Sequence, residues 1–292
     1  MKRDTSKYPK EIREGAFLIW KELGETPLQA LEYLRKQEGI ETDVKMTYAG
    51  RLDPLAEGEL LILVGEECKK KDEYLGLDKE YEVEILLGVQ TDTGDVMGVI
   101  DTKPKFKSQE LGTPKQGFGV DEVRNILSKF IGKISWPYPI FSSKTVQGKP
   151  LFVWALEGKI GEVEIPTRES EIYELELLSA PSAKLSISEL RELVHTKINS
   201  IPKVPESIVD GKDTKRLGQD FRRAEVLQSW ADFFDNVASK PLATEQVQVF
   251  DVIKIRCKCS SGTYMRTLAQ KVGEELGVPA LALSIVRTEI VI

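Results

Sequence analysis

Asp53 is the first residue of this chain whose setting suggests chemistry. It stands in the stretch YAGRLDPLAEGEL, residues 48–60, between a leucine and a proline and with glycines on both sides. In one interpretation the side chain makes an Asx-type turn to its own backbone, and Pro54 fixes the direction of the chain. In the other, the turn presents the carboxylate to a cleft as a nucleophile or a base, which requires that it be ionised and partly desolvated. Turn chemistry alone favours the first.

Arg266 is a candidate partner for this carboxylate. An ionised acid inside a cleft needs one, because burial alone raises the pKa of a carboxyl group and neutralises it. Arg266 lies in SSGTYMRTLAQ, in an otherwise apolar stretch that is expected to be helical. It can equally be a residue on the surface of that helix, and spacing in the sequence does not show that the two side chains meet.

Metal and disulfide chemistry find little support in the sequence. Three cysteines (Cys68, Cys257 and Cys259) form no disulfide framework, and with a single histidine they make a poor zinc set. The aspartates of TDTGDVMG lack the spacing of a calcium loop. The cysteine usage is typical of a reducing compartment, so we expect a cytoplasmic protein.

Composition indicates an ordinary globular chain. The 292 residues are 41% hydrophobic and 30% charged, and no apolar run approaches the roughly 20 residues that span a bilayer. The net charge of −6 argues weakly against a nucleic-acid partner. Basic residues nevertheless gather in KTVQGK and in GKDTKRLGQDFRR, runs that are as typical of a solvated surface as of a phosphate-binding one.

The elements that must position these residues can be read from periodicity. Thr26 and Pro27 predict the start of a helix with Leu28, Leu31 and Leu34 on one face. Residues 79–100 predict a hairpin around a turn rich in Thr, Asp and Gly. Further helices are predicted over 120–132, from Leu151, and over 186–198, 214–237 and 261–277, strands over 169–180, 246–260 and 283–292, and a mobile loop over 101–119. Helices and strands mix without strict alternation, which favours an α+β fold.

Four segments, in the same order along the chain, resemble those of the TruB family of pseudouridine synthases. They are GRLDPLAEGELLILVGEECKK, KEYEVEILLGVQTDTGDVMG, YPIFSSKTVQGKPLFVWALEG and CSSGTYMRTLAQKVGEELGVPALALSIVRT. The resemblance implies a single α+β catalytic domain over 1–292, with a mixed, mainly antiparallel sheet flanked by helices. It also implies an isomerase that converts uridine to pseudouridine in the T-loop of tRNA without metal or cofactor, and that acts as a monomer.

The resemblance also implies roles for particular residues. Asp53 would be the nucleophile that attacks an everted uridine, Tyr81 would stack on the base and move a proton, and Arg266 would hold Asp53 ionised and aimed. Other residues would contact the RNA or line the same pocket: Tyr48, Asp95, Tyr264, Lys21 and Lys144. Lys21 would alternatively support the site from behind.

The sequence departs from the family pattern in three places. Tyr48 replaces a histidine that commonly stacks under the flipped base, and the single histidine, His195, is expected to be a surface or core-edge residue. Residues 181–245 form an expected helical insertion, with RNA contact slightly favoured over packing on the outside. No small C-terminal RNA-binding (PUA) domain is expected after VRTEIVI.

Two other functions stay open. The same fold would serve an RNA chaperone or assembly factor with little turnover, which the Tyr48 substitution and the acidic charge favour. A retaining glycoside hydrolase also uses an aspartate nucleophile, but it needs a second carboxylic acid about 5 Å away, and no paired-carboxylate motif is evident.

Overall fold

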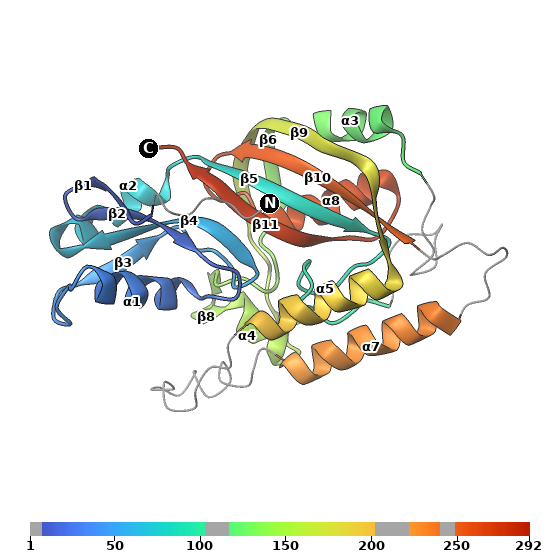
Figure 1. Cartoon of the computed structure of the whole chain (residues 1–292), viewed down its shortest axis with the longest axis horizontal. Coiled ribbons are helices and arrows are strands. Elements are labelled where there is room, and N and C mark those ends of the chain that lie inside the picture. Colours follow the sequence, from blue (N-terminus) through green and yellow to red (C-terminus); the bar gives the residue numbers. More distant parts are fainter. Residues whose placement is uncertain (1–7, 103–116, 202–221, 240–248) are drawn as a thin grey trace.

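A mixed sheet carries the fold in the computed structural model, which describes residues 8–102, 117–201, 222–239 and 249–292. Within these ranges nine strands pair in the order β1-β2-β4-β11-β5-β10-β9-β6, with β3 added beside β4 (Figure 1). Among the described strands only β4 and β11 pair in parallel, and the other ladders between them are antiparallel. The strands are β1 (Lys10–Arg13), β2 (Ala16–Lys21), β3 (Met46–Ala49), β4 (Ala56–Val64), β5 (Lys79–Leu87), β6 (Gly132–Pro137), β9 (Thr167–Ser186), β10 (Val249–Cys259) and β11 (Ala280–Ile290).

Helices cover both faces of the sheet. Figure 1 shows α8 behind the central strands and α5 beside α7 along the opposite side. The helices are α1 (Pro27–Gln37), α2 (Lys71–Leu75), α3 (Val120–Ser128), α4 (Leu151–Leu156), α5 (Ile187–Ser200), α7 (Arg223–Ser239) and α8 (Met265–Leu276), and β7 (Thr145–Val146) pairs with β8 (Lys149–Pro150) in a separate ribbon. The expected α+β class with a mainly antiparallel sheet is confirmed.

The central strand β5 shows why two helical layers are needed. Its buried side chains alternate between the faces, so that Ile85 belongs to the same buried cluster as Leu268 and Val272 of α8, whereas Leu86 belongs to the cluster that contains Trp230 of α7. A strand that is buried on both faces reads as a continuous apolar run rather than as an alternating one. The run LLILV of β4 has the same cause, since successive residues join different clusters.

The predicted helices form where their caps and apolar faces indicate. Thr26 caps α1 in a capping box with Gln29, and Ser186 caps α5 in the same way with Glu189. One detail is wrong: Leu31 and Leu34 are buried, but Leu28 is 54% exposed. It lies in the first turn of α1, before the helix reaches the β4 residues that cover its apolar face.

The hairpin predicted over 79–100 forms only in part. The first half is β5, but the returning half makes an isolated bridge between Thr91 and Ile100 instead of a strand. The turn between them is bonded to β11, where Asp95 bridges Ala282. Most of the loop predicted over 101–119, and the first part of the helix predicted over 214–237, lie outside the described residues.

Candidate active site

A cavity of 290 Å³ brings together residues from five separate segments of the chain, 50–56, 75–81, 142–143, 260–266 and 285–287. Asp53 comes from the loop before β4, Tyr81 from β5, Tyr264 from the residue that precedes α8, and Arg266 from the first turn of α8. Buried charged side chains concentrate here, since Lys79, Arg266 and Arg287 all line the cavity and are at most 6% exposed. Buried charges are costly, and a cleft that gathers them is a candidate functional site.

Asp53 and Arg266 form an ion pair. The Oδ2 atom of Asp53 lies 2.9 Å from Nε of Arg266, and the aspartate side chain is 47% exposed while that of the arginine is 7% exposed. The two Nη groups of Arg266 donate to the carbonyl oxygens of Thr93 and Phe141, at 2.7 and 3.1 Å. Burial alone would lower the pKa of Arg266, but the neighbouring carboxylates outweigh it and raise that pKa. The guanidinium is therefore a fixed positive charge against which one carboxylate faces the cavity.

The loop that carries Asp53 is held through its backbone. Arg287 of β11 donates to the carbonyl oxygens of Gly50 and Arg51, at 3.2 and 3.4 Å. The Pro54 carbonyl accepts from the amide of Gly24 at 2.9 Å, and Gly50 has a φ of +78°, which favours glycine. Among the described residues, the Asp53 carboxylate makes its ion pair and no hydrogen bond to a nearby amide. The constrained turn thus aims the side chain at Arg266 rather than back at its own backbone.

Asp95 does not stand where an RNA contact was expected. It is 7% exposed, its Oδ1 accepts from Thr93 Oγ1 and from the amide of Met97, and its Oδ2 lies 3.7 Å from Nε of Arg266. Burial raises the pKa of Asp95, and Arg266 opposes that shift. Asp95 is a second carboxylate behind the guanidinium, and it does not line the cavity. It is therefore in no position to donate a proton to a bound molecule, as the second acid of a glycoside hydrolase must.

Tyr81 lies opposite Arg287 in the β5–β11 ladder. Burial raises the pKa of the Tyr81 phenol, and the Arg287 guanidinium opposes the shift. The hydroxyl therefore stays protonated at neutral pH, beside the arginine that holds the Asp53 loop. Arg287 is 1% exposed and was not among the site residues predicted from the sequence. The available signal was a charged residue inside the otherwise apolar strand LSIVRTEIVI.

Tyr264 lines the cavity beside a small aromatic group. Its ring meets Tyr138 edge-on with centroids 5.8 Å apart, and burial raises the pKa of its hydroxyl. Lys144 lies over the Tyr138 ring with its Nζ 5.1 Å from the centroid. Lys144 is half-buried and does not line the cavity itself. The ring of Tyr138 lies between it and the lining residue Tyr264.

Lys21 and Tyr48 lie outside the cavity. Lys21 is fully buried, and its ammonium donates to the carbonyl oxygens of Glu22 and Glu25 at 3.0 and 2.7 Å. Burial lowers the pKa of Lys21 to about 8. Because the Lys21 ammonium has no exposed surface, it does not reach a phosphate. Its position instead agrees with a supporting role, since it binds the turn over residues 22–25, in which the amide of Gly24 donates to the carbonyl of Pro54. Tyr48 lies on β3, where Lys71 approaches its ring to 5.5 Å.

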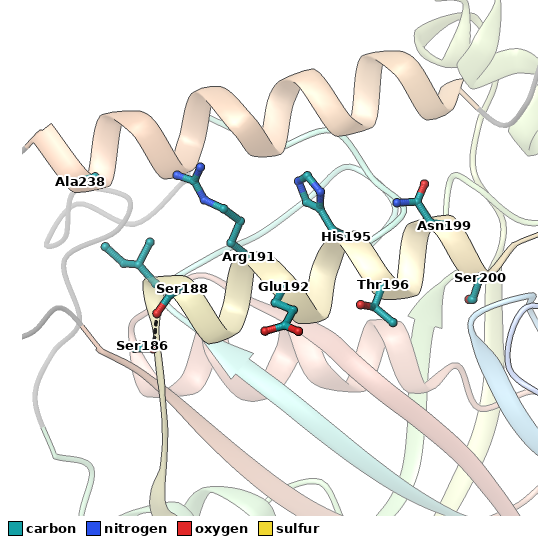
Figure 2. Close-up of a pocket in the computed structure, with 10 residues that line it drawn as sticks. Ser186, Ser188, Arg191, Glu192, His195, Thr196, Asn199, Ser200 and Ala238 are labelled. Atoms are coloured by element: carbon teal, nitrogen blue, oxygen red, sulfur yellow. Dashed lines mark hydrogen bonds between the residues drawn. The ribbon is translucent and has the colours of Figure 1, made fainter.

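A larger cavity, of 1050 Å³, lies along α5 and shares no residue with the first. Figure 2 shows Arg191 and His195 directed from α5 toward α7, with Glu192 and Thr196 on the other side of the helix. None of its described lining residues is both charged and buried, and Arg191 already pairs with Asp235 at 3.2 Å. His195 is exposed, as the sequence indicated.

Two absences hold for the described part of the chain. No group of three or more His, Cys, Asp or Glu side chains there is arranged to hold a metal ion. None of its helices combines the length and the apolar character that crossing a membrane requires.

Comparison with known proteins decides the family. The model of the TruB family pseudouridylate synthase (N terminal domain) matches residues 35–193, more than half of the chain. The chain belongs to the TruB family. The match includes Asp53, Tyr81 and Asp95 and ends before Arg266.

Individual TruB relatives extend the similarity. tRNA pseudouridine synthase 4 of Saccharomyces cerevisiae is 27% identical over 84% of this chain and 60% of its own length. tRNA pseudouridine synthase B of Caldanaerobacter subterraneus subsp. tengcongensis is 36% identical over 56% of this chain and 53% of its own length. The chain thus spans half to three fifths of the curated relatives it matches. A chain from the crystal structure of a Cbf5-Nop10-Gar1 complex shares the fold, with a TM-score of 0.50 at 15% identity over 94% of this chain and 48% of that one.

Proposed function

We propose that this chain isomerises uridine to pseudouridine in the T-loop of tRNA, with Asp53 as the nucleophile. The single observation that carries the proposal is the half-exposed Asp53 carboxylate, 2.9 Å from a buried arginine and at the wall of a cavity that Tyr81 also lines. The relatives' printed names give the substrate class, a tRNA.

The geometry suits a flipped base. A uridine inside a folded loop hides its glycosidic bond, so an enzyme that acts there must turn the nucleotide out into a pocket. The cavity of 290 Å³ is close to the lower end of the range of about 300–1,000 Å³ for small-molecule sites. Its lining offers Tyr81 for stacking, with Leu52 and Ile285 as apolar walls.

The reaction balances within the substrate. The bond between the ribose carbon and N1 of uracil breaks, the base turns, and a new bond joins the same ribose carbon to C5. C5 loses its proton and N1 gains one, so neither oxidant nor water is consumed. Asp53 would hold the detached fragment, by attack either on the ribose or on the base. Tyr81, with its phenol protonated and beside the base, would stack on it and take part in the proton transfer.

Arg266 and the residues around it would serve as support. Arg266 keeps Asp53 charged and aimed by a charge-assisted hydrogen bond, and Asp95 and two carbonyl oxygens fix Arg266 in turn. Tyr264 would line the pocket, and Lys144, at the edge of the aromatic group, would meet a phosphate. A stacking role for Tyr48 requires the RNA to reach β3.

Mapping of pseudouridine in bulk tRNA, after incubation with the purified protein, tests the proposal. New pseudouridine at one T-loop position is the expected result. Absence of any new pseudouridine, together with a stable complex with tRNA, would instead favour an RNA chaperone or assembly factor of the same fold.

A further inference from the structure

The insertion contacts the active-site turn through α7 and the residue before it. The turn over residues 91–100 carries Thr93 and Asp95, both of which contact Arg266. From the insertion, Ser229 Oγ accepts from the amide of Ile100 at 2.9 Å, and the fully buried Trp230 donates its Nε1 hydrogen to the carbonyl of Val96 at 3.0 Å. The far side of the turn therefore rests on α7.

Arg222, the residue before α7, adds an ion pair to these contacts. Its two Nη groups bind both carboxylate oxygens of Asp92, at 2.7 and 3.2 Å, in a bidentate pair. Asp92 is the neighbour of Thr93 and also accepts from the amide of Val99 at 2.9 Å, across the turn. The pair thus closes the turn at its base.

Arg222 also reaches a second segment of the site. Its guanidinium carbon lies 4.6 Å from the ring centroid of Phe141, and the carbonyl of Phe141 accepts from Arg266 at 3.1 Å. Arg266 binds the carbonyls of Thr93 and Phe141 from the cavity side, while Arg222 binds Asp92 and the Phe141 ring from the insertion side. The same two segments are held from both sides by two arginines.

The backbone of Arg222 indicates that these contacts are specific. Its φ of +59° is in the left-handed region, which residues other than glycine rarely adopt. Such a conformation persists where the surroundings over-determine it, and it clusters at functional sites. The side chain that leaves this backbone reaches both Asp92 and Phe141.

We infer that Arg222 is a positioning residue that fixes Arg266, and through it Asp53, by clamping the 91–100 turn to the segment around Phe141. The inference rests on the proposed function and gives the described part of the insertion a role different from RNA binding. Its apolar face supports this, since Val226, Phe233, Phe234 and Val237 of α7 are buried against α5 and the sheet.

The chain provides a matched control. Arg191 of α5 also pairs with an aspartate, Asp235 at 3.2 Å, and also lies over a phenylalanine ring, that of Phe234 at 5.1 Å. The Arg191–Asp235 pair joins α5 to α7, and no described hydrogen bond or ion pair links it to the 91–100 turn. Arg191→Ala therefore removes an arginine–aspartate pair of the same kind within the same insertion, although a single and more exposed one, and leaves the hydrogen bonds of the turn in place.

The experiment compares Arg222→Ala, Arg222→Gly, Arg222→Lys and Arg191→Ala in the full chain. Arg222→Gly removes the clamp without left-handed strain, so a folding defect in the alanine variant does not decide the result. Arg222→Lys keeps the charge but loses the bidentate geometry and the stacking, so it should recover part of the effect. Three quantities are measured: hydrogen exchange of the amides in 91–100, the single-turnover rate at saturating tRNA, and the dissociation constant for tRNA.

Loss of the charged pair should speed exchange at Met97, Val99 and Ile100 by about tenfold in Arg222→Gly but not in Arg191→Ala. Misplacement of Arg266 should lower the saturating rate about 10- to 100-fold, with tRNA affinity within about threefold. Exchange in 91–100 that matches Arg191→Ala would overturn the inference, whatever the activity. A loss of affinity at an unchanged saturating rate would also overturn it, because Arg222 would then contact RNA. A wild-type protein that makes no pseudouridine refutes the proposed function alone, and the exchange measurement still decides the clamp.

Discussion

Asp53 and Asp95 approach the same atom, Nε of Arg266, at 2.9 and 3.7 Å, but their side chains are 47% and 10% exposed. One carboxylate faces the cavity, and the other is enclosed by Thr93 and the amide of Met97. Because Asp95 supplies charge from behind, the guanidinium stays fixed while Asp53 keeps an open face toward a substrate.

Asp95→Asn should lower the single-turnover rate without lowering the stability of the fold. The amide keeps an oxygen acceptor for Thr93 and Met97 but loses the charge that holds Arg266, so the single-turnover rate should fall about tenfold or more. Burial raises the pKa of Asp95, so the wild-type charge is unfavourable for folding. The variant should therefore melt at the same temperature as the wild type or higher. A variant with normal rate, or one that is both slow and clearly less stable, would contradict the role given to Asp95.

Tyr81→Phe and Tyr81→Ala should separate the ring from the hydroxyl. Phenylalanine keeps the stacking surface but cannot transfer a proton, so tRNA affinity should be normal while pseudouridine formation falls about 10²- to 10⁴-fold. Alanine should lose affinity as well. Full activity in Tyr81→Phe, measured under single turnover, would remove the proton-transfer role and leave stacking.

Gly58→Ala tests why the start of β4 needs its glycine. Gly58 has a φ of +122°, and a Cβ atom there would lie 2.2 Å from the carbonyl oxygen of Arg287, which is backbone and cannot move aside. Gly65 has a φ of +60° with open space around it, so Gly65→Ala serves as the control. The control should lose about 1–2 kcal/mol of unfolding free energy from strain, and Gly58→Ala should lose more. If urea titrations gave equal losses of unfolding free energy for Gly58→Ala and Gly65→Ala, the clash with the Arg287 carbonyl would be relieved in the variant.

Lys21→Met should change how stability depends on pH. Burial lowers the pKa of Lys21 from 10.5 to about 8 in the folded state. Between pH 8 and 10.5 the unfolded chain therefore binds more protons at this residue than the folded one, so its contribution to stability rises with pH. The wild type should gain up to about 3 kcal/mol relative to the variant across this window, at about 1.4 kcal/mol per pKa unit. Parallel stability curves for the two proteins would mean that the ammonium is not buried.

Local patterns in the sequence were enough to predict several elements. Thr26 with Pro27, and the apolar spacing of Val123, Ile126 and Leu127, depend on contacts within one helix and its cap, so α1 and α3 were correctly predicted. The apolar run of β4 was not assigned as a strand, because a strand buried on both faces has no alternation to detect. The parallel pairing of β4 with β11 joins distant segments, and no local signal fixes it.

Some residues of the site were likewise predicted from the sequence, and others were not. Resemblance brought Asp53, Tyr81 and Arg266 together, and the structure places all three at one cavity. The resemblance implied that Asp95 would meet RNA. Its burial beside Arg266, in a turn that α7 also contacts, comes from the tertiary fold. Arg287 and Arg222 were not singled out, because their partners are mainly backbone carbonyls or residues far away along the chain.

Asp53→Asn provides the most direct test of the central claim. The amide is nearly the same size as the carboxylate but carries no charge and is not a nucleophile, so tRNA should still bind within a few fold. The measurement is tritium release from tRNA that carries 5-tritiated uridine, under single turnover with saturating enzyme. We predict release by the wild type, at one tritium per modified uridine, and none by Asp53→Asn. Substantial release by Asp53→Asn would contradict the account, because the carboxylate that faces the cavity would then not perform the reaction.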